Sequence, residues 1–219
     1  MSAARPSARE LRDHQVTWQA ASALLSYPDE QLLVHVPLVH AAVEGLPDAQ
    51  SAPLARFLRH VEATTVLELA AHFVTTFDLQ RRCCLYLTYY AHGDTRKRGM
   101  ALLAFKTAYR AAGLELGDDE LPDHLAVVLE FAATGDPKAG RQLLLDHRAG
   151  IELLRLALED TSSPYVDVLR AVTATLPPLA GDERDAVARL AAEGPPVEEV
   201  GLQPFAPPEY MPQTEGARR

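Results

Sequence analysis

The stretch Pro53-Leu-Ala-Arg-Phe-Leu-Arg-His-Val61 decides the fold class. Its apolar side chains at Leu54, Phe57, Leu58 and Val61 follow the i, i+3, i+4, i+7 spacing of one face of an α-helix. Pro53 stands where the first turn of a helix tolerates proline. The stretch therefore predicts an amphipathic helix whose apolar face packs against other helices.

The sequence near the N-terminus predicts a second helix. Ser7 and Glu10 form the Ser-x-x-Glu pattern of a capping box, in which each side chain accepts a hydrogen bond from the backbone of the other residue. Leu11, Trp18 and Leu25 follow at intervals of seven residues, so they share one helix face. This combination predicts a helix that begins near Ser7.

Similar start signals recur along the chain. Thr65 and Glu68 make a second capping box, and Asp94 is placed to cap a helix from about 95 to 112. Pro122 is placed to open another helix, which Gly135 closes. Together these signals predict an all-α, single-domain helical bundle of about eight to ten helices over residues 1–193.

Two stretches depart from the helical pattern. The residues from Leu85 to Tyr90 leave a choice open, because their aromatic side chains suit a short strand while the flanking helices favour helix or loop. Residues 194–219 contain six prolines and no apolar period, which predicts a Pro-rich disordered tail.

Composition narrows the class of protein. The chain has 219 residues, of which 47% are hydrophobic, enough to bury a core. No apolar run is long enough to span a bilayer, and the first twelve residues are polar, unlike a signal peptide, so we expect a cytoplasmic protein without direct membrane insertion. A net charge of −9 argues against binding to nucleic acid through phosphate contacts.

Motifs for catalysis or cofactor binding are absent from the sequence. There is no phosphate-binding glycine loop, no dinucleotide-binding fingerprint and no nucleophile elbow. Cys83 and Cys84 are adjacent and lack the spaced companions of a zinc site; we interpret them as small buried residues, with a redox or cofactor contact as the alternative. We therefore expect a binding protein with no catalytic residues, no metal and no cofactor of its own.

Several polar and aromatic residues between 86 and 124 have two readings. Tyr86 and Tyr89 suit core packing, or an amphipathic wall for a bound peptide. Four further residues carry imidazole or carboxylate groups: His92, Asp94, Asp123 and His124. Such groups together bind divalent ions, which would suit an all-α metal-dependent hydrolase, but the ligand pairs of such a site are incomplete. Arg96 and Arg98 oppose the dipole at a helix start, which favours a partner with acidic groups.

In these segments the chain resembles the delta subunit of respiratory nitrate reductase, the NarJ-type assembly chaperone, within the wider group of chaperones for molybdenum enzymes. The His-Gly-Asp-x-Arg-x-Arg-Gly block and the Leu-Pro-Asp-His-Leu block are specific in combination, and the resemblance extends over about residues 11–190. The matching stretches are Leu24-Leu25-Ser26-Tyr27-Pro28-Asp29, Phe77-Asp78, Leu85-Tyr86-Leu87, His92-Gly93-Asp94-Thr95-Arg96-Lys97-Arg98-Gly99, Leu114-Glu115-Leu116 and Glu120-Leu121-Pro122-Asp123-His124-Leu125.

The resemblance implies an all-helical chaperone that binds the N-terminal leader-like segment of the nitrate reductase catalytic (alpha) subunit. It implies that the subunit is held while its molybdenum cofactor is inserted, and that the chaperone then leaves the finished enzyme. In the wider group the Pro-Asp-His motif is linked with leader recognition. The residues expected to bind the partner are Tyr86, Tyr89, His92, Asp94, Arg96, Arg98, Glu120, Pro122, Asp123 and His124.

Two expectations remain to be weighed against the structure. If Pro122 opens a helix, Asp123 and His124 lie in its first turn, and they matter more for maturation of the partner than for stability of this chain. The rival functions are an all-α metal-dependent hydrolase and a generic helical scaffold subunit.

Overall fold

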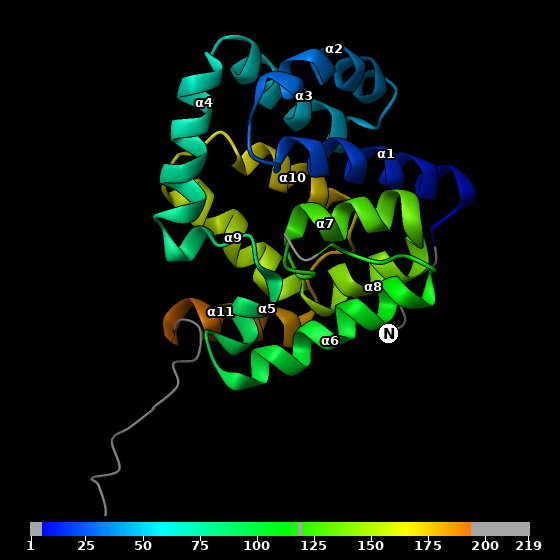
Figure 1. Ribbon diagram of the computed structural model, residues 1–219, viewed down its shortest axis with the longest axis vertical. Coiled ribbons are helices and arrows are strands. Elements are labelled where there is room, and N and C mark those ends of the chain that lie inside the picture. The colour runs from blue at the N-terminus through cyan, green and yellow to red at the C-terminus, as the bar shows by residue number, and fades with distance from the viewer. Residues whose placement is uncertain (1–5, 118–119, 194–219) are drawn as a thin grey trace, which may run out of the picture.

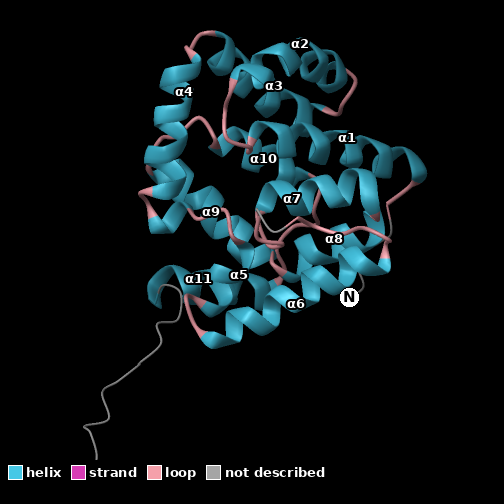
Figure 2. Cartoon of the chain, in the orientation of Figure 1, coloured by secondary structure: helices cyan, strands magenta, loops and turns pink. Residues whose placement is uncertain are grey.

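The computed structural model describes residues 6–117 and 120–193 of the protein. Within these residues the chain is built from helices and contains no strand, which confirms the all-α prediction (Figure 2). The elements in chain order are α1 (Ala8–Leu24), α2 (Glu30–Glu44), α3 (Asp48–Glu62), α4 (Val66–Phe73), the π-helical turn η1 (Val74–Asp78), the 3-10 turn η2 (Arg81–Cys83), α5 (Leu87–His92), α6 (Arg96–Ala111), α7 (Leu125–Glu130), the π-helical turn η3 (Phe131–Gly135), α8 (Pro137–Asp146), α9 (Arg148–Asp160), α10 (Val166–Ala174) and α11 (Gly181–Glu193). The predicted tail, residues 194–219, lies outside the described residues.

Helix α1 crosses the middle of the molecule, with α2 and α3 on one side and α7 on the other (Figure 1). Its Trp18 side chain is fully buried, and the indole N–H donates a hydrogen bond of 2.8 Å to the hydroxyl of Thr175, just after α10. The hydroxyl of Ser22 donates to the carbonyl of Ala126 in α7, also at 2.8 Å. Buried polar contacts thus supplement apolar packing around the central helix.

Residues 53–61 form part of helix α3, as predicted, but the placement of Pro53 in the first turn is wrong, because α3 begins at Asp48 and Pro53 lies inside the helix. Leu54, Phe57, Leu58 and Val61 are all buried, at 0–1% exposure. They face the interior, where α3 packs against α10 and α2. Burial of four large apolar side chains contributes roughly 1.5–3 kcal/mol each, far more than any cap in this chain.

Both predicted capping boxes are formed. The N–H of Ser7 donates to the Glu10 carboxylate at 2.7 Å and the N–H of Glu10 donates to the Ser7 hydroxyl at 3.3 Å. Thr65 and Glu68 make the same pair of bonds at 3.1 and 3.3 Å. Helix starts whose capping residues lie within one turn of each other were therefore predictable from the sequence.

Two other predicted helix starts are wrong. Thr95, rather than Asp94, is the N-cap residue of α6, and the Asp94 carboxylate instead accepts a hydrogen bond from Arg98. Pro122 does not open a helix, because α7 begins at Leu125, three residues later. Asp94 is thus engaged by Arg98, four residues along the chain, and Asp123, which follows Pro122, is engaged by Leu87 and Thr88 from a distant segment.

The described residues contain eleven α-helices, one more than the upper end of the expected range. Helix α5 occupies most of the stretch that the sequence left open between strand, helix and loop. Gly93 lets the chain turn from α5 into α6, since its φ of 56° and ψ of −152° belong to a region that side-chain-bearing residues avoid. A Cβ on Gly150 of α9 would lie 3.0 Å from the Tyr90 ring of α5, so glycine permits their close approach.

Candidate functional site

A short backbone pairing joins two predicted site segments that are far apart in sequence. The N–H of Leu87 donates to the carbonyl of Asp123 at 3.0 Å, and the N–H of Leu125 donates to the carbonyl of Leu85 at 2.8 Å. Tyr86 and His124 face each other between these bonds as a single antiparallel bridge. The pairing holds His124 in an extended conformation after a turn in which the His124 N–H donates to the Leu121 carbonyl at 3.1 Å, so the helix starts at Leu125 and not at Pro122.

The Asp123 carboxylate lies at the centre of the site and is fully buried, at 0% exposure. One of its oxygens accepts a hydrogen bond of 3.1 Å from the backbone N–H of Thr88 and another from the Thr88 hydroxyl. Thr88 is in the first turn of α5, whose N-cap residue makes no side-chain cap. Asp123 therefore caps α5 from a distant segment, where a negative charge also suits the helix dipole.

Arg98 closes the same site from the first turn of α6. Its guanidinium lies 3.8 Å from the Asp123 carboxylate, donates to the Thr88 hydroxyl at 3.2 Å and donates to Asp94 at 3.3 Å. It also lies over the ring of Tyr86, 5.4 Å from the centroid. The Arg98 side chain, 18% exposed, is thus turned toward acidic groups of its own chain, which offsets its unfavourable place in the helix dipole.

The rings of Tyr86 and His124 complete this group of five residues, the Asp123 junction: Tyr86, Thr88, Arg98, Asp123 and His124. The two rings meet edge to face with centroids 5.3 Å apart. Burial lowers the pKa of His124, although the nearby carboxylates of Glu120 and Asp123 act in the opposite direction. Burial likewise raises the pKa of the Tyr86 phenol.

Asp123 was expected in the first turn of a helix, which is wrong because α7 begins at Leu125. Its carboxylate has no access to solvent and bonds two elements, so a change at Asp123 must affect the fold as well as any partner. His124 is half-buried and its Nδ1 atom has no hydrogen-bond partner among the described residues. These two adjacent residues therefore have different surroundings.

The other predicted residues surround the junction without entering its hydrogen-bond network, except Asp94, which bonds Arg98. Asp94, Arg96 and Glu120 are exposed, whereas Tyr89 and His92 are half-buried. Pro122 is buried, and its carbonyl accepts a hydrogen bond of 2.6 Å from the hydroxyl of Tyr109 in α6. The structure thus separates exposed residues, which a partner can reach, from buried residues that shape the loop.

Two residues of the site were missed in the sequence. Thr88 lies between aromatic residues that suggested packing, and only its meeting with Asp123 reveals its role. Tyr109 lies four turns into α6, where it packs against Phe131 with centroids 4.6 Å apart and holds the Pro122 carbonyl. Neither residue carries a local signal, because each acts on a segment distant in sequence.

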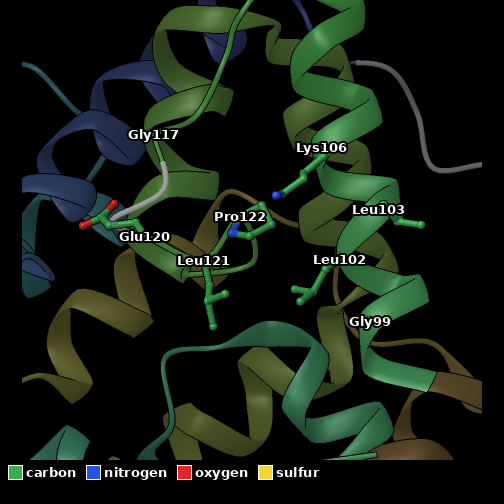
Figure 3. A pocket seen from close by; sticks show the side chains of 8 residues that line it. All are labelled: Gly99, Leu102, Leu103, Lys106, Gly117, Glu120, Leu121 and Pro122. Carbon is green, nitrogen blue, oxygen red and sulfur yellow. The ribbon is translucent and has the colours of Figure 1, made fainter. Parts of the chain in front are cut away.

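A cavity of about 230 Å³ opens beside the junction, between α6 on one side and Gly117 with residues 120–122 on the other (Figure 3). Its lining is mainly apolar, with one cationic and one anionic side chain. The lining residues are Gly99, Leu102, Leu103, Lys106, Gly117, Glu120, Leu121 and Pro122.

The cysteines flank the start of this region. Cys83 is buried and Cys84 is half-buried, and burial raises the pKa of both thiols, which disfavours the reactive thiolate form.

In residues 6–117 and 120–193, no group of three or more His, Cys, Asp or Glu side chains is arranged to hold a metal ion. Over the same ranges, no helix combines the length and the apolar character needed to cross a membrane.

Comparison with known proteins finds a family and several relatives. The family model described as nitrate reductase delta subunit matches residues 44–171. A Bacillus subtilis protein named "Probable nitrate reductase molybdenum cofactor assembly chaperone NarJ" is 33% identical over 165 residues, which are 75% of this chain and 90% of that protein. The Escherichia coli protein named "Nitrate reductase molybdenum cofactor assembly chaperone NarJ" is 33% identical over 147 residues, covering 66% of this chain and 62% of the relative.

Two further similarities concern a longer protein and a solved structure. The "Nitrate reductase-like protein NarX" of Mycobacterium tuberculosis is 43% identical over 160 residues, covering 73% of this chain but only 24% of its own length. The chain thus spans about a quarter of that relative. The crystal structure of an Archaeoglobus fulgidus protein assigned to redox enzyme maturation superimposes with a TM-score of 0.55 at 23% identity, covering 80% of this chain and 96% of that one. This last similarity concerns the fold.

Proposed function

Because the chain belongs to the nitrate reductase delta subunit family, we propose that it is an assembly chaperone for a nitrate reductase and catalyses no reaction itself. The observation that carries the proposal is the family match over residues 44–171, joined to relatives whose names state this role. The chaperone acts in the cytoplasm and leaves the enzyme once assembly is complete.

The proposed partner is the catalytic subunit, bound through its N-terminal leader-like segment while the molybdenum cofactor is inserted. Such a segment is recognised as an amphipathic helix in a groove. A net charge of −9 favours a partner with basic groups and disfavours nucleic acid. The chaperone needs no cofactor of its own for this role, since it only stabilises a conformation of the partner.

The proposed contact surface surrounds the Asp123 junction. Exposed and half-buried side chains touch the partner directly, while buried ones hold the surface in shape. The direct contacts are Tyr86, Tyr89, His92, Asp94, Arg96, Glu120 and His124, and the supporting residues are Arg98, Pro122 and Asp123. The exposed carboxylates of Asp94 and Glu120 meet basic groups of the leader.

The energetics suit a complex that forms and then releases. Ordering a free peptide costs about 2–5 kcal/mol. A micromolar complex, near −8 kcal/mol, then needs roughly 10–13 kcal/mol from contacts. A few buried leucine or phenylalanine anchors at about 1.5–3 kcal/mol each supply much of this.

Maturation in cells tests the proposal. The subunits of a nitrate reductase are expressed in a host lacking its own delta-family chaperone, with and without this protein. We expect active, molybdenum-loaded enzyme only when the chain is present, and we expect the purified enzyme to lack it. Equal molybdenum content in both cultures contradicts the proposal. The chain remaining in the finished enzyme indicates a scaffold subunit, and a stoichiometric metal with phosphatase activity indicates a hydrolase.

A further inference from the structure

The cavity beside α6 has features of a seat for one side chain. Its volume of about 230 Å³ is several times the roughly 30 Å³ share of one water molecule. It is smaller than the roughly 300–1,000 Å³ of pockets that enclose whole small molecules. Apolar atoms of Leu102, Leu121 and Pro122 form much of its wall. A single large apolar side chain fits these dimensions and this lining.

The rim of the cavity is also apolar, although it faces water. Leu103 and Leu121, which line the cavity, are 51% and 40% exposed. Large apolar side chains gathered in this way mark a surface that another molecule covers. The rim therefore extends the cavity into a docking surface along α6.

Charge defines the occupant further. The Lys106 side chain extends across the cavity toward Pro122, whereas the Glu120 carboxylate points away (Figure 3). Lys106 makes no ion pair within the part of the chain that the structure describes. An ammonium group over an apolar wall favours an occupant that brings a carboxylate beside its apolar side chain.

The walls are held in place by groups that do not line the cavity. The Tyr109 hydroxyl holds the carbonyl of Pro122 at 2.6 Å, and Thr88 and Arg98 hold the next residue, Asp123. A pre-shaped wall lowers the ordering cost of binding. The Asp123 junction therefore supports the segment that forms one wall of the cavity.

We propose that this cavity is the anchor subsite for a helical segment of the partner that carries a leucine- or phenylalanine-sized side chain with an acidic side chain one turn away. The inference rests on the proposed function, because the partner is the nitrate reductase catalytic subunit. The apolar side chain fills the space between Leu102 and Pro122, and the carboxylate pairs with Lys106. The acidic rim residue Glu120 remains available for a basic group on the same segment.

Filling the cavity tests the subsite. Gly99 lines it, and a Cβ built there has no neighbour within 4 Å, so the backbone position accepts a side chain and Gly99→Leu is designed to place bulk in the space. The matched control is Ala104→Leu, an exposed position of the same helix that does not line the cavity. Binding of purified apo catalytic subunit, and of a synthetic peptide copying its N-terminal segment, is measured by calorimetry with the full chain.

We expect Gly99→Leu to weaken both complexes at least about tenfold, and Ala104→Leu to leave them unchanged. If Gly99→Leu fails to fold, Leu121→Trp fills the cavity from the opposite wall and carries the same expectation. Unchanged affinity in the filling variants, while the wild-type protein binds, overturns the subsite but not the proposed function. Absence of binding by the wild-type protein overturns both. If the filling variants lose only the self-association of this chain and keep both complexes, the occupant is a second copy of the chain and the proposed subsite is overturned.

The charge element has its own test. Lys106→Glu is expected to weaken peptide binding about tenfold, with the loss growing at low salt, whereas Lys106→Gln has a smaller effect. A peptide whose acidic residues are replaced by their amides should bind wild type and Lys106→Glu equally. A persistent difference with the amide peptide, or no effect of Lys106→Glu on the original peptide, overturns the carboxylate assignment.

Discussion

Two junctions hold distant segments of this chain together by different means. The Asp123 junction uses a buried carboxylate, a guanidinium and a hydroxyl. The second, the Tyr165 cluster, uses rings from α3, α4, η1 and the turn before α10. Its members are Phe57, His72, Phe73, Phe77 and Tyr165, and the Tyr165 ring lies 4.8–6.0 Å from the other four.

The contrast separates stability from positioning. Aromatic packing gains free energy from buried area and tolerates changes of detail, whereas a buried ion pair gains little net free energy because desolvation offsets it. Removing one member of such a pair is nevertheless costly, since the other is left without a partner. We therefore infer that the Tyr165 cluster stabilises the fold and the Asp123 junction fixes the shape of the proposed binding surface.

The largest expected effect is at the Tyr165 cluster. Tyr165→Ala removes a side chain that is 2% exposed and leaves a cavity among four rings, so we expect the free energy of unfolding to fall by about 3–5 kcal/mol. Tyr165→Phe keeps the ring and should cost less than about 1.5 kcal/mol. Urea denaturation followed by circular dichroism measures both. If the free energy of unfolding of the alanine variant falls by less than about 1 kcal/mol, the role given to this cluster is contradicted.

Asp123→Ala should destabilise the chain by about 2–4 kcal/mol, because the N–H and hydroxyl of Thr88 lose a buried acceptor and Arg98 loses an ion-pair partner. We also expect weaker binding of the partner peptide under conditions where the variant is folded. Asp123→Asn keeps an acceptor oxygen and should recover part of the stability. Denaturation and calorimetry on the same samples separate the two effects. A variant that is as stable as wild type contradicts the junction.

Acid should weaken the Tyr165 cluster. Burial lowers the pKa of His60 and of His72, whose rings meet edge to face with centroids 5.9 Å apart, and His60 further lowers the pKa of His72. The unfolded chain therefore takes up protons near its pKa of 6.5 before the folded chain does, so stability is full above that pH and falls as pH drops through 6.5 toward the lowered values. His60→Gln with His72→Gln should lessen this loss in melting temperatures between pH 7 and 5. An unchanged slope would place the acid sensitivity elsewhere.

The smallest expected effect on stability is at the edge of the Asp123 junction. Asp94 pairs with the same guanidinium as Asp123, but its side chain is 72% exposed. Asp94→Ala should change the free energy of unfolding by no more than about 0.5 kcal/mol. If Asp94 contacts the partner, peptide affinity falls while the melting temperature stays constant. A large loss of stability shows that exposure does not separate these two carboxylates.

The sequence was informative where structure is local. The face of α3 and the two capping boxes depend on residues within one or two turns, so spacing alone predicted them. The role of Asp123 was not predictable in this way, because it depends on residues 86 and 124 meeting across the fold. The same reason hid Tyr109, whose hydroxyl bonds the Pro122 carbonyl. Asp123, which was expected at the start of its own helix, is instead a buried cap for helix α5.

Calorimetric titration of the full chain with a synthetic peptide copying the N-terminal segment of the nitrate reductase catalytic subunit tests the central claim most directly. We predict binding near micromolar concentration, about −8 kcal/mol. We also predict that Asp94→Ala with Glu120→Ala weakens it about tenfold, because both carboxylates are exposed and are proposed to pair with basic groups of the peptide. Binding of the apo subunit without any response to the peptide, or equal affinity in the double variant, would contradict the account.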